Sequence, residues 1–197
     1  MTTIEFWYEF ASTYSYPAAM RISDIAAKAG VKVKWCPFLL GPIFKAQGWA
    51  DSPFNIYPLK GVYMWRDMER ICQHYNLAFT RPVIFPQNGL NAARLALSPV
   101  VLAKRAEFSR RVYQAAFAHQ QDISSLETLT EILKSMAIDE QQALSQAASP
   151  EVKAALRANT ETAIKKQIFG APSFVTPDGE LFWGDDRLEQ AVAWRPG

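Results

Sequence analysis

The sequence predicts an α/β protein in which both ends of the chain build one sheet around an insertion made of helices. Three observations predict it: a strand, helix, strand pattern at the N-terminus, about a hundred residues of helical periodicity, and a β-hairpin with a short helix near the C-terminus. We therefore expect a β-α-β and β-β-α sheet domain in residues 1–60 and 169–197, with residues 61–168 as an inserted helical domain. A chain of 197 residues, 49% of them hydrophobic, can bury such a core.

The first unit starts with an aromatic-rich extended segment, Ile4–Phe10. An apolar-periodic helix then runs to a glycine stop at Gly30, and Val31–Trp35 alternates apolar with basic residues, as a strand does. The turn before the helix, Ala11–Tyr16, contains no glycine, so the dinucleotide-binding fingerprint is absent.

Residues 37–60 contain four prolines, so we expect little regular structure there. A loop of this length in a compact domain is usually functional. Its many apolar side chains either cover the core or form a wall for a flat aromatic ligand. These side chains are Phe38, Leu39, Leu40, Ile43, Phe44, Trp49 and Phe54.

Helix starts and a hairpin organise the rest of the chain. Ser124 and Asp139 are each followed three residues later by Glu or Gln, as in a capping box, and Pro150 suits the first position of a helix that runs to about Ile168. Residues 173–183 then predict a β-hairpin around Pro177-Asp178-Gly179, followed by a final helix over residues 187–194.

Charge and cysteine content narrow the function. Twenty-one basic and nineteen acidic residues give a net charge of +2, which favours neither a nucleic acid nor a membrane as partner and points to a small molecule. Cys36 and Cys72 have no C-x-x-C or metal-ligand spacing, so we expect free core thiols and no metal. The sequence shows no signal peptide or membrane-spanning run, and we expect a cytoplasmic protein.

Three short segments contain the candidate functional residues. Ser12 lies where the first strand meets the first helix, where it either donates to a bound anion such as a thiolate or only caps the helix. A cis Ala171–Pro172 bond would turn the Ala171 backbone toward an extended ligand, although trans is the commoner form. Asp185 and Asp186 either cap the last helix or hold a ligand ammonium group.

In order along the chain, these segments resemble the branch of the thioredoxin superfamily that contains DsbA-like proteins, kappa-class glutathione transferases and 2-hydroxychromene-2-carboxylate isomerases. The resemblance covers essentially the whole chain and implies a thioredoxin-like fold. It rests on Phe6–Tyr16, with Ser12 in place of the first redox cysteine, and on Pro58–Met64, Phe169–Pro172 and Phe182–Leu188.

The resemblance implies glutathione as cofactor. Ser12 would hydrogen-bond the glutathione sulfur, Ala171 before cis-Pro172 would pair with the cysteinyl unit, and Lys60 would reach a carboxylate. Asp185 with Asp186 would hold the γ-glutamyl end. The family's asparagine has no clean counterpart here, because residues 48–60 are about two residues longer, and Trp49 or Asn55 takes its place. The substrate residues expected on this basis are Tyr14, Phe44, Trp49 and Asn55.

The resemblance implies an isomerase that interconverts 2-hydroxychromene-2-carboxylate and trans-o-hydroxybenzylidenepyruvate in aromatic hydrocarbon (naphthalene) catabolism, acting as a homodimer on a small aromatic substrate. Two alternatives stay open: a kappa-class transferase that conjugates glutathione to electrophiles, and a non-catalytic thioredoxin-like binding module. A disulfide oxidoreductase is disfavoured because positions 12 and 15 are both serine.

Overall fold

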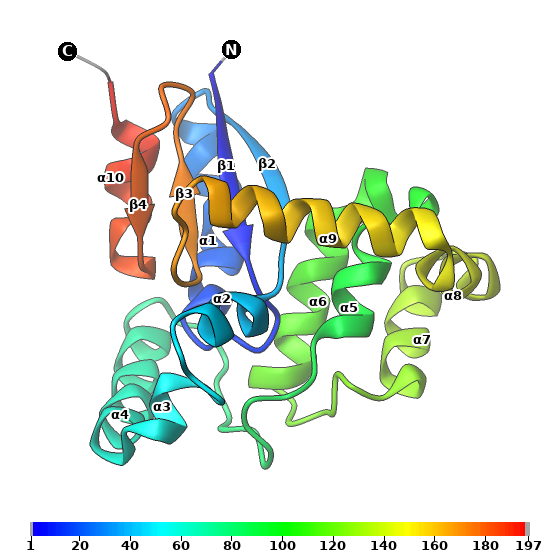
Figure 1. The fold of residues 1–197 in the computed structure, drawn as a ribbon, viewed down its shortest axis with the longest axis horizontal. Coiled ribbons are helices and arrows are strands. Elements are labelled where there is room, and N and C mark those ends of the chain that lie inside the picture. Colours follow the sequence, from blue (N-terminus) through cyan, green and yellow to red (C-terminus); the bar gives the residue numbers. More distant parts are fainter. Residues whose placement is uncertain (1, 196–197) are drawn as a thin grey trace.

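The computed structural model describes residues 2–195 and contains one four-stranded sheet in the order β2-β1-β3-β4. The central strand β1 (Thr3–Tyr8) pairs in parallel with β2 (Lys32–Pro37) and antiparallel with β3 (Ser173–Val175). β4 (Leu181–Trp183) completes the hairpin with β3. The expected sheet built from both ends of the chain is confirmed (Figure 1).

Helices cover both faces of this sheet. α1 (Ser15–Lys28) and α10 (Leu188–Ala193) pack on one face, where Ile4, Phe6 and Tyr8 of β1 are buried. α9 (Pro150–Lys165) crosses the other face, where Trp7 is buried (Figure 1). The alternation of side chains along β1 therefore supplies both layers of the core.

Residues 61–168 are mostly helical, as predicted. Figure 1 shows that the helices do not form one block, because α4 lies beside α3 (Pro53–Ile56) below the sheet and α5 to α8 lie together to one side. The division of the chain into two domains stays a prediction. The helices are α4 (Pro58–His74), α5 (Leu90–Leu95), α6 (Arg105–Phe117), α7 (Leu126–Ser135) and α8 (Glu140–Ala148), with a 3-10 turn η1 (Pro99–Lys104).

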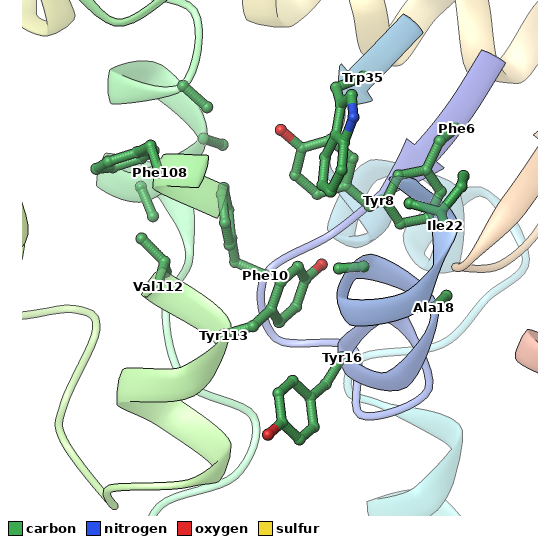
Figure 2. Close-up of a cluster of buried hydrophobic side chains, with 14 of the residues drawn as sticks. Phe6, Tyr8, Phe10, Tyr16, Ala18, Ile22, Trp35, Phe108, Val112 and Tyr113 are labelled. Atoms are coloured by element: carbon green, nitrogen blue, oxygen red, sulfur yellow. The ribbon is translucent and has the colours of Figure 1, made fainter. Parts of the chain in front are cut away.

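An aromatic cluster joins the sheet to α6 (Figure 2). The Tyr8 and Phe10 rings lie 5.4 Å apart, and Tyr113 of α6 lies 5.3 Å from Phe10 between centroids. The Tyr8 and Ser109 hydroxyls share a buried hydrogen bond of 2.8 Å. This cluster gives the chain that leaves β1 a rigid support.

The expectation of little regular structure in residues 37–60 was wrong. This segment contains α2 (Leu40–Ala46) and α3 (Pro53–Ile56). Pro42 falls in the first turn of α2, Pro53 opens α3 and Pro58 opens α4, positions where a helix makes no use of the missing N–H. These prolines start helices instead of breaking them.

Two of the three predicted helix starts are confirmed. The Asp139 carboxylate accepts a hydrogen bond from a backbone N–H of α8, and the hydroxyl of Ser149 does the same ahead of Pro150 in α9. The Ser124 cap was wrong, because α7 starts at Leu126 and the Ser124 hydroxyl donates to Asp122 instead.

The remaining expectations concern the end of the chain and the thiols. The final helix begins as a 3-10 turn, η2 (Asp185–Arg187), before α10. Cys36 and Cys72 are both buried and unpaired, as expected. None of the helices described in the structure is long and apolar enough to cross a membrane.

Candidate active site

A cavity of about 1280 Å³ opens where β1 ends and α1 begins. Its wall is formed by the 9–14 turn, by residues 39–54 around α2 and α3, by part of α4, by residues 85–90, and by the segments 169–172 and 183–187. The volume exceeds that of an ordinary small-ligand pocket.

Ser12 lies in this wall at the entrance to α1. Its Oγ donates to the Ala171 carbonyl oxygen at 2.8 Å and accepts from the Ser15 amide at 3.3 Å. The hydroxyl therefore joins the two ends of the chain and also satisfies one N–H at the start of the helix. Because a hydroxyl proton can rotate, the same group can donate to an anion in the cavity.

The Ala171–Pro172 peptide bond is cis, the form that the resemblance implies. Two hydrogen bonds hold this corner: the Ser173 hydroxyl donates to the Gly170 carbonyl at 2.8 Å, and the Gly184 amide donates to the Pro172 carbonyl at 3.0 Å. Ala171 and Pro172 both line the cavity, so they present main-chain groups to it from a fixed position.

The two aspartates of η2 have different surroundings. Asp185 is buried, and its Oδ1 accepts from the Arg21 guanidinium at 2.8 Å. Burial raises the pKa of Asp185 to about 6, although Arg21 beside it lowers the pKa. Asp186 is exposed at the cavity rim, where its Oδ2 lies 3.5 Å from the Arg187 guanidinium. Gly184, with φ of 108°, adopts a conformation that side chains rarely allow and leaves room for the Asp186 carboxylate.

Lys60 and Tyr14 supply polar groups to the wall. The Lys60 ammonium lies 4.7 Å from the centre of the Tyr57 ring at the start of α4. The Tyr14 hydroxyl donates to Asp67 Oδ2 at 3.0 Å. Burial and the Asp67 charge raise the pKa of Tyr14, so this phenol stays protonated.

The apolar side chains of residues 38–54 divide between the two roles left open by the sequence. Phe38 and Ile43 belong to the buried core on the α9 face of the sheet. Phe44 and Trp49 are half-buried, line the cavity, and have ring centres 5.6 Å apart. The segment therefore covers the core and also provides two aromatic rings to the cavity wall, with their planes 55° apart.

Asn55 differs from the other predicted site residues, because it does not line the cavity. Its amide donates to Asp51 Oδ2 at 3.0 Å and to the Phe85 carbonyl at 3.3 Å, so it joins α3 to the 85–90 segment. Every other predicted site residue lies in the cavity wall. They are Ser12, Tyr14, Phe44, Trp49, Lys60, Ala171, Pro172, Asp185 and Asp186.

Sequence reasoning missed Glu9 and Asp67, which line the same cavity. Burial raises the pKa of Glu9 to about 7. The only sequence signal for Glu9 as a site residue was its position as an acidic residue between Tyr8 and Phe10 at the end of the first strand. Among residues 2–195, no group of His, Cys, Asp and Glu side chains is arranged to hold a metal ion.

Residues 3–193 match the family described as the DSBA-like thioredoxin domain, and the chain belongs to this family. A 2-hydroxychromene-2-carboxylate isomerase of Sphingobium xenophagum is 26% identical over 95% of this chain and 94% of its own length. Human glutathione S-transferase kappa 1 is 26% identical over 95% of this chain and 88% of its own length.

The fold of a solved 2-hydroxychromene-2-carboxylate isomerase superposes with a TM-score of 0.85 at 22% identity, covering 95% of this chain and 91% of that chain. These three relatives thus carry two kinds of name, 2-hydroxychromene-2-carboxylate isomerase and kappa-class glutathione transferase.

Proposed function

We propose that the protein is a glutathione-dependent isomerase that interconverts 2-hydroxychromene-2-carboxylate and trans-o-hydroxybenzylidenepyruvate in aromatic hydrocarbon catabolism. The observation that carries the proposal is the pairing of Ser12 with Ala171 in the wall of a cavity that also holds an aromatic face. The similarity to two isomerases along nearly the whole chain supports the same reaction.

The residues in the wall fit glutathione in number and in chemistry. Ser12 offers a hydroxyl donor for the sulfur, and the main chain at Ala171 is placed to pair with the cysteinyl unit. Lys60 can bind a carboxylate, and exposed Asp186 can bind the γ-glutamyl ammonium. Asp185 holds the turn that presents Asp186 and does not bind the ligand itself, because its carboxylate is paired with Arg21.

Bound glutathione supplies a sulfur nucleophile that adds reversibly to a conjugated carbon, so that a double bond becomes a rotatable single bond. Ser12 lowers the barrier by turning its hydroxyl from the Ala171 carbonyl toward the negatively charged sulfur. Phe44 and Trp49 hold the flat substrate against the cavity wall and exclude water from it. The cytoplasmic location and the homodimer belong to the same proposal.

A kappa-class transferase that leaves glutathione attached to an electrophile is the second candidate. The human kappa-class relative is as similar to this chain as the Sphingobium isomerase, at 26% identity. Both reactions use the same binding residues, and they differ in whether the sulfur leaves the product. Dithiol exchange lacks a nucleophile here, because both thiols are buried and burial raises the pKa of each to about 12.

The test is the ultraviolet spectrum of 2-hydroxychromene-2-carboxylate incubated with the protein, with and without glutathione. The isomerase gives an equilibrium mixture of the two isomers that depends on glutathione and leaves its concentration unchanged. Loss of free glutathione into a conjugate, measured by thiol titration, supports the transferase. An unchanged spectrum and an unchanged glutathione concentration, with and without glutathione, contradict both the isomerase and the transferase and favour a binding module.

A further inference from the structure

The Glu9 carboxyl is a titratable group in the cavity wall that the proposed function leaves without a role. It lies three residues before Ser12, and the two belong to one tight turn, because the Ser12 amide donates to the Glu9 carbonyl at 3.0 Å. The Tyr113 hydroxyl donates to the same carbonyl at 2.9 Å. Two donors therefore fix the main chain that places Glu9 and Ser12 on the same wall.

The side chain of Glu9 is fixed at one oxygen and free at the other. Oε2 accepts from the Ala11 amide at 2.9 Å. Oε1 faces Gly89, where an added Cβ would lie 3.1 Å from it, so the glycine leaves the space that this oxygen occupies. One carboxylate oxygen anchors the group, and the other remains available to carry a proton.

No cation within residues 2–195 forms an ion pair with Glu9. The elements packed against it present the Tyr113 phenol from α6, the Ala11 and Ser12 amides from its own turn, and Gly89 from the 85–90 segment. Burial raises the pKa of Glu9 to about 7, although the Ala11 and Ser12 amides lower it. The other charged side chains lining the cavity are Asp51, Lys60, Asp67, Asp185, Asp186 and Arg187.

We propose that Glu9 is the proton acceptor that converts bound glutathione to its thiolate, with Ser12 as the donor that stabilises the sulfur. This inference rests on the proposed use of glutathione. The Glu9 carboxylate accepts the thiol proton: the S–H bond breaks, its electron pair stays on sulfur, and an O–H bond forms on Glu9. The carboxyl returns the proton when glutathione leaves, so no other acid or base is consumed. A base that titrates near neutral pH suits this transfer.

The experiment counts protons as glutathione binds at pH 8, where Glu9 is mostly ionised. Calorimetric titration in two buffers of different ionisation enthalpy gives the protons released to solvent. Ultraviolet difference absorbance gives the thiolate formed in the same samples. We expect the wild-type protein to form thiolate while releasing few protons, because the thiolate charge beside Glu9 raises the pKa of the carboxyl further and holds the transferred proton on it. We also expect it to gain an infrared band of a protonated carboxyl.

Three variants make the result specific. Glu9→Gln keeps an oxygen for the Ala11 amide but cannot take a proton, so we expect about one proton released per thiolate formed and no new carboxyl band. Glu9→Asp should restore retention of the proton at least in part. Glu107→Gln removes an exposed carboxylate of α6 and should match the wild type. Thermal unfolding of each variant shows whether it is folded.

The outcomes separate the two proposals. A wild-type protein that binds no glutathione overturns the proposed function and this inference with it. A wild-type protein that binds glutathione, forms thiolate and releases one proton for each thiolate overturns the role of Glu9 alone. The same holds if Glu9→Gln and the wild type give equal proton counts.

Discussion

The Ser12 hydroxyl donates to the Ala171 carbonyl oxygen at 2.8 Å, which joins two residues 159 positions apart in the chain. The contact exists because β1 pairs with β3, so the end of the first strand meets the start of the third. It places the proposed donor to sulfur and the main chain proposed to pair with the glutathione peptide in one corner of the cavity.

Replacing Ser12 by alanine should raise the apparent thiol pKa of bound glutathione and lower activity by about ten- to a hundredfold. The reason is the loss of one charge-assisted hydrogen bond, worth about 1.5–3 kcal/mol. The rate and the thiolate absorbance, each followed against pH, measure the effect. An apparent thiol pKa equal to that of the wild type in Ser12→Ala would contradict the assigned role. Ser12→Cys should not restore full activity.

Asp186→Asn should weaken glutathione binding by about tenfold or more while leaving stability nearly unchanged. Asp186 is exposed at the cavity rim, and a charge-assisted bond to an ammonium is worth more than the ~1.4 kcal/mol that a factor of ten represents. Calorimetric titration measures the affinity. Unchanged affinity in this variant would assign Asp186 to the turn only.

Asp185→Asn is the matched comparison, and it should lower the stability of the protein more than its affinity for glutathione. Its carboxylate is buried against Arg21, so the change weakens a hydrogen bond between charged groups and should lower the free energy of unfolding by about 1.5–3 kcal/mol. Urea unfolding measures this loss. Equal stability of Asp185→Asn and the wild type would show that the ion pair does not support the turn.

Asn55→Ala should leave glutathione affinity within about threefold of the wild type. Asn55 lies outside the cavity wall. The change removes its hydrogen bonds to Asp51 and Phe85, which should lower the free energy of unfolding by about 1 kcal/mol in total. Trp49→Ala, in the wall, is the contrasting variant and should raise the KM of the aromatic substrate. A tenfold loss of glutathione affinity in Asn55→Ala would restore the role that the resemblance gives to this position.

The stability of the protein should fall as the pH rises from about 4.5 to 7, by an amount that depends on Glu9. Folding raises the pKa of this carboxyl from 4.5 to about 7, so the folded state holds the proton more tightly over that range. Its contribution is complete below pH 4.5 and lost above pH 7. Urea unfolding at several pH values should show that the free energy of unfolding falls by about 1–3 kcal/mol more in the wild type than in Glu9→Gln over this range. Equal pH dependence of stability in the two proteins would mean that burial does not raise the pKa of Glu9.

The sequence by itself determined the order of strands and helices, the sheet built from both ends, and most of the residues of the candidate site. The order of the elements follows from strand alternation and helix periodicity, which are local patterns. The site residues come from the resemblance of short motifs, such as residues 182–188, to a known family. The helices α2 and α3 could also have been recognised, because a proline opens α3 and another falls in the first turn of α2.

The tertiary structure alone decided which of two adjacent aspartates is exposed and what surrounds Glu9. Asp185 and Asp186 are the same residue type at neighbouring positions, and only the approach of Arg21 from α1 separates the buried from the exposed one. Likewise, the pKa of Glu9 depends on its burial and on amides in its own turn, with Gly89 leaving space for its free oxygen. The burial of Glu9 and the ion pair of Asp185 both come from groups far apart in sequence, and no local pattern encodes them.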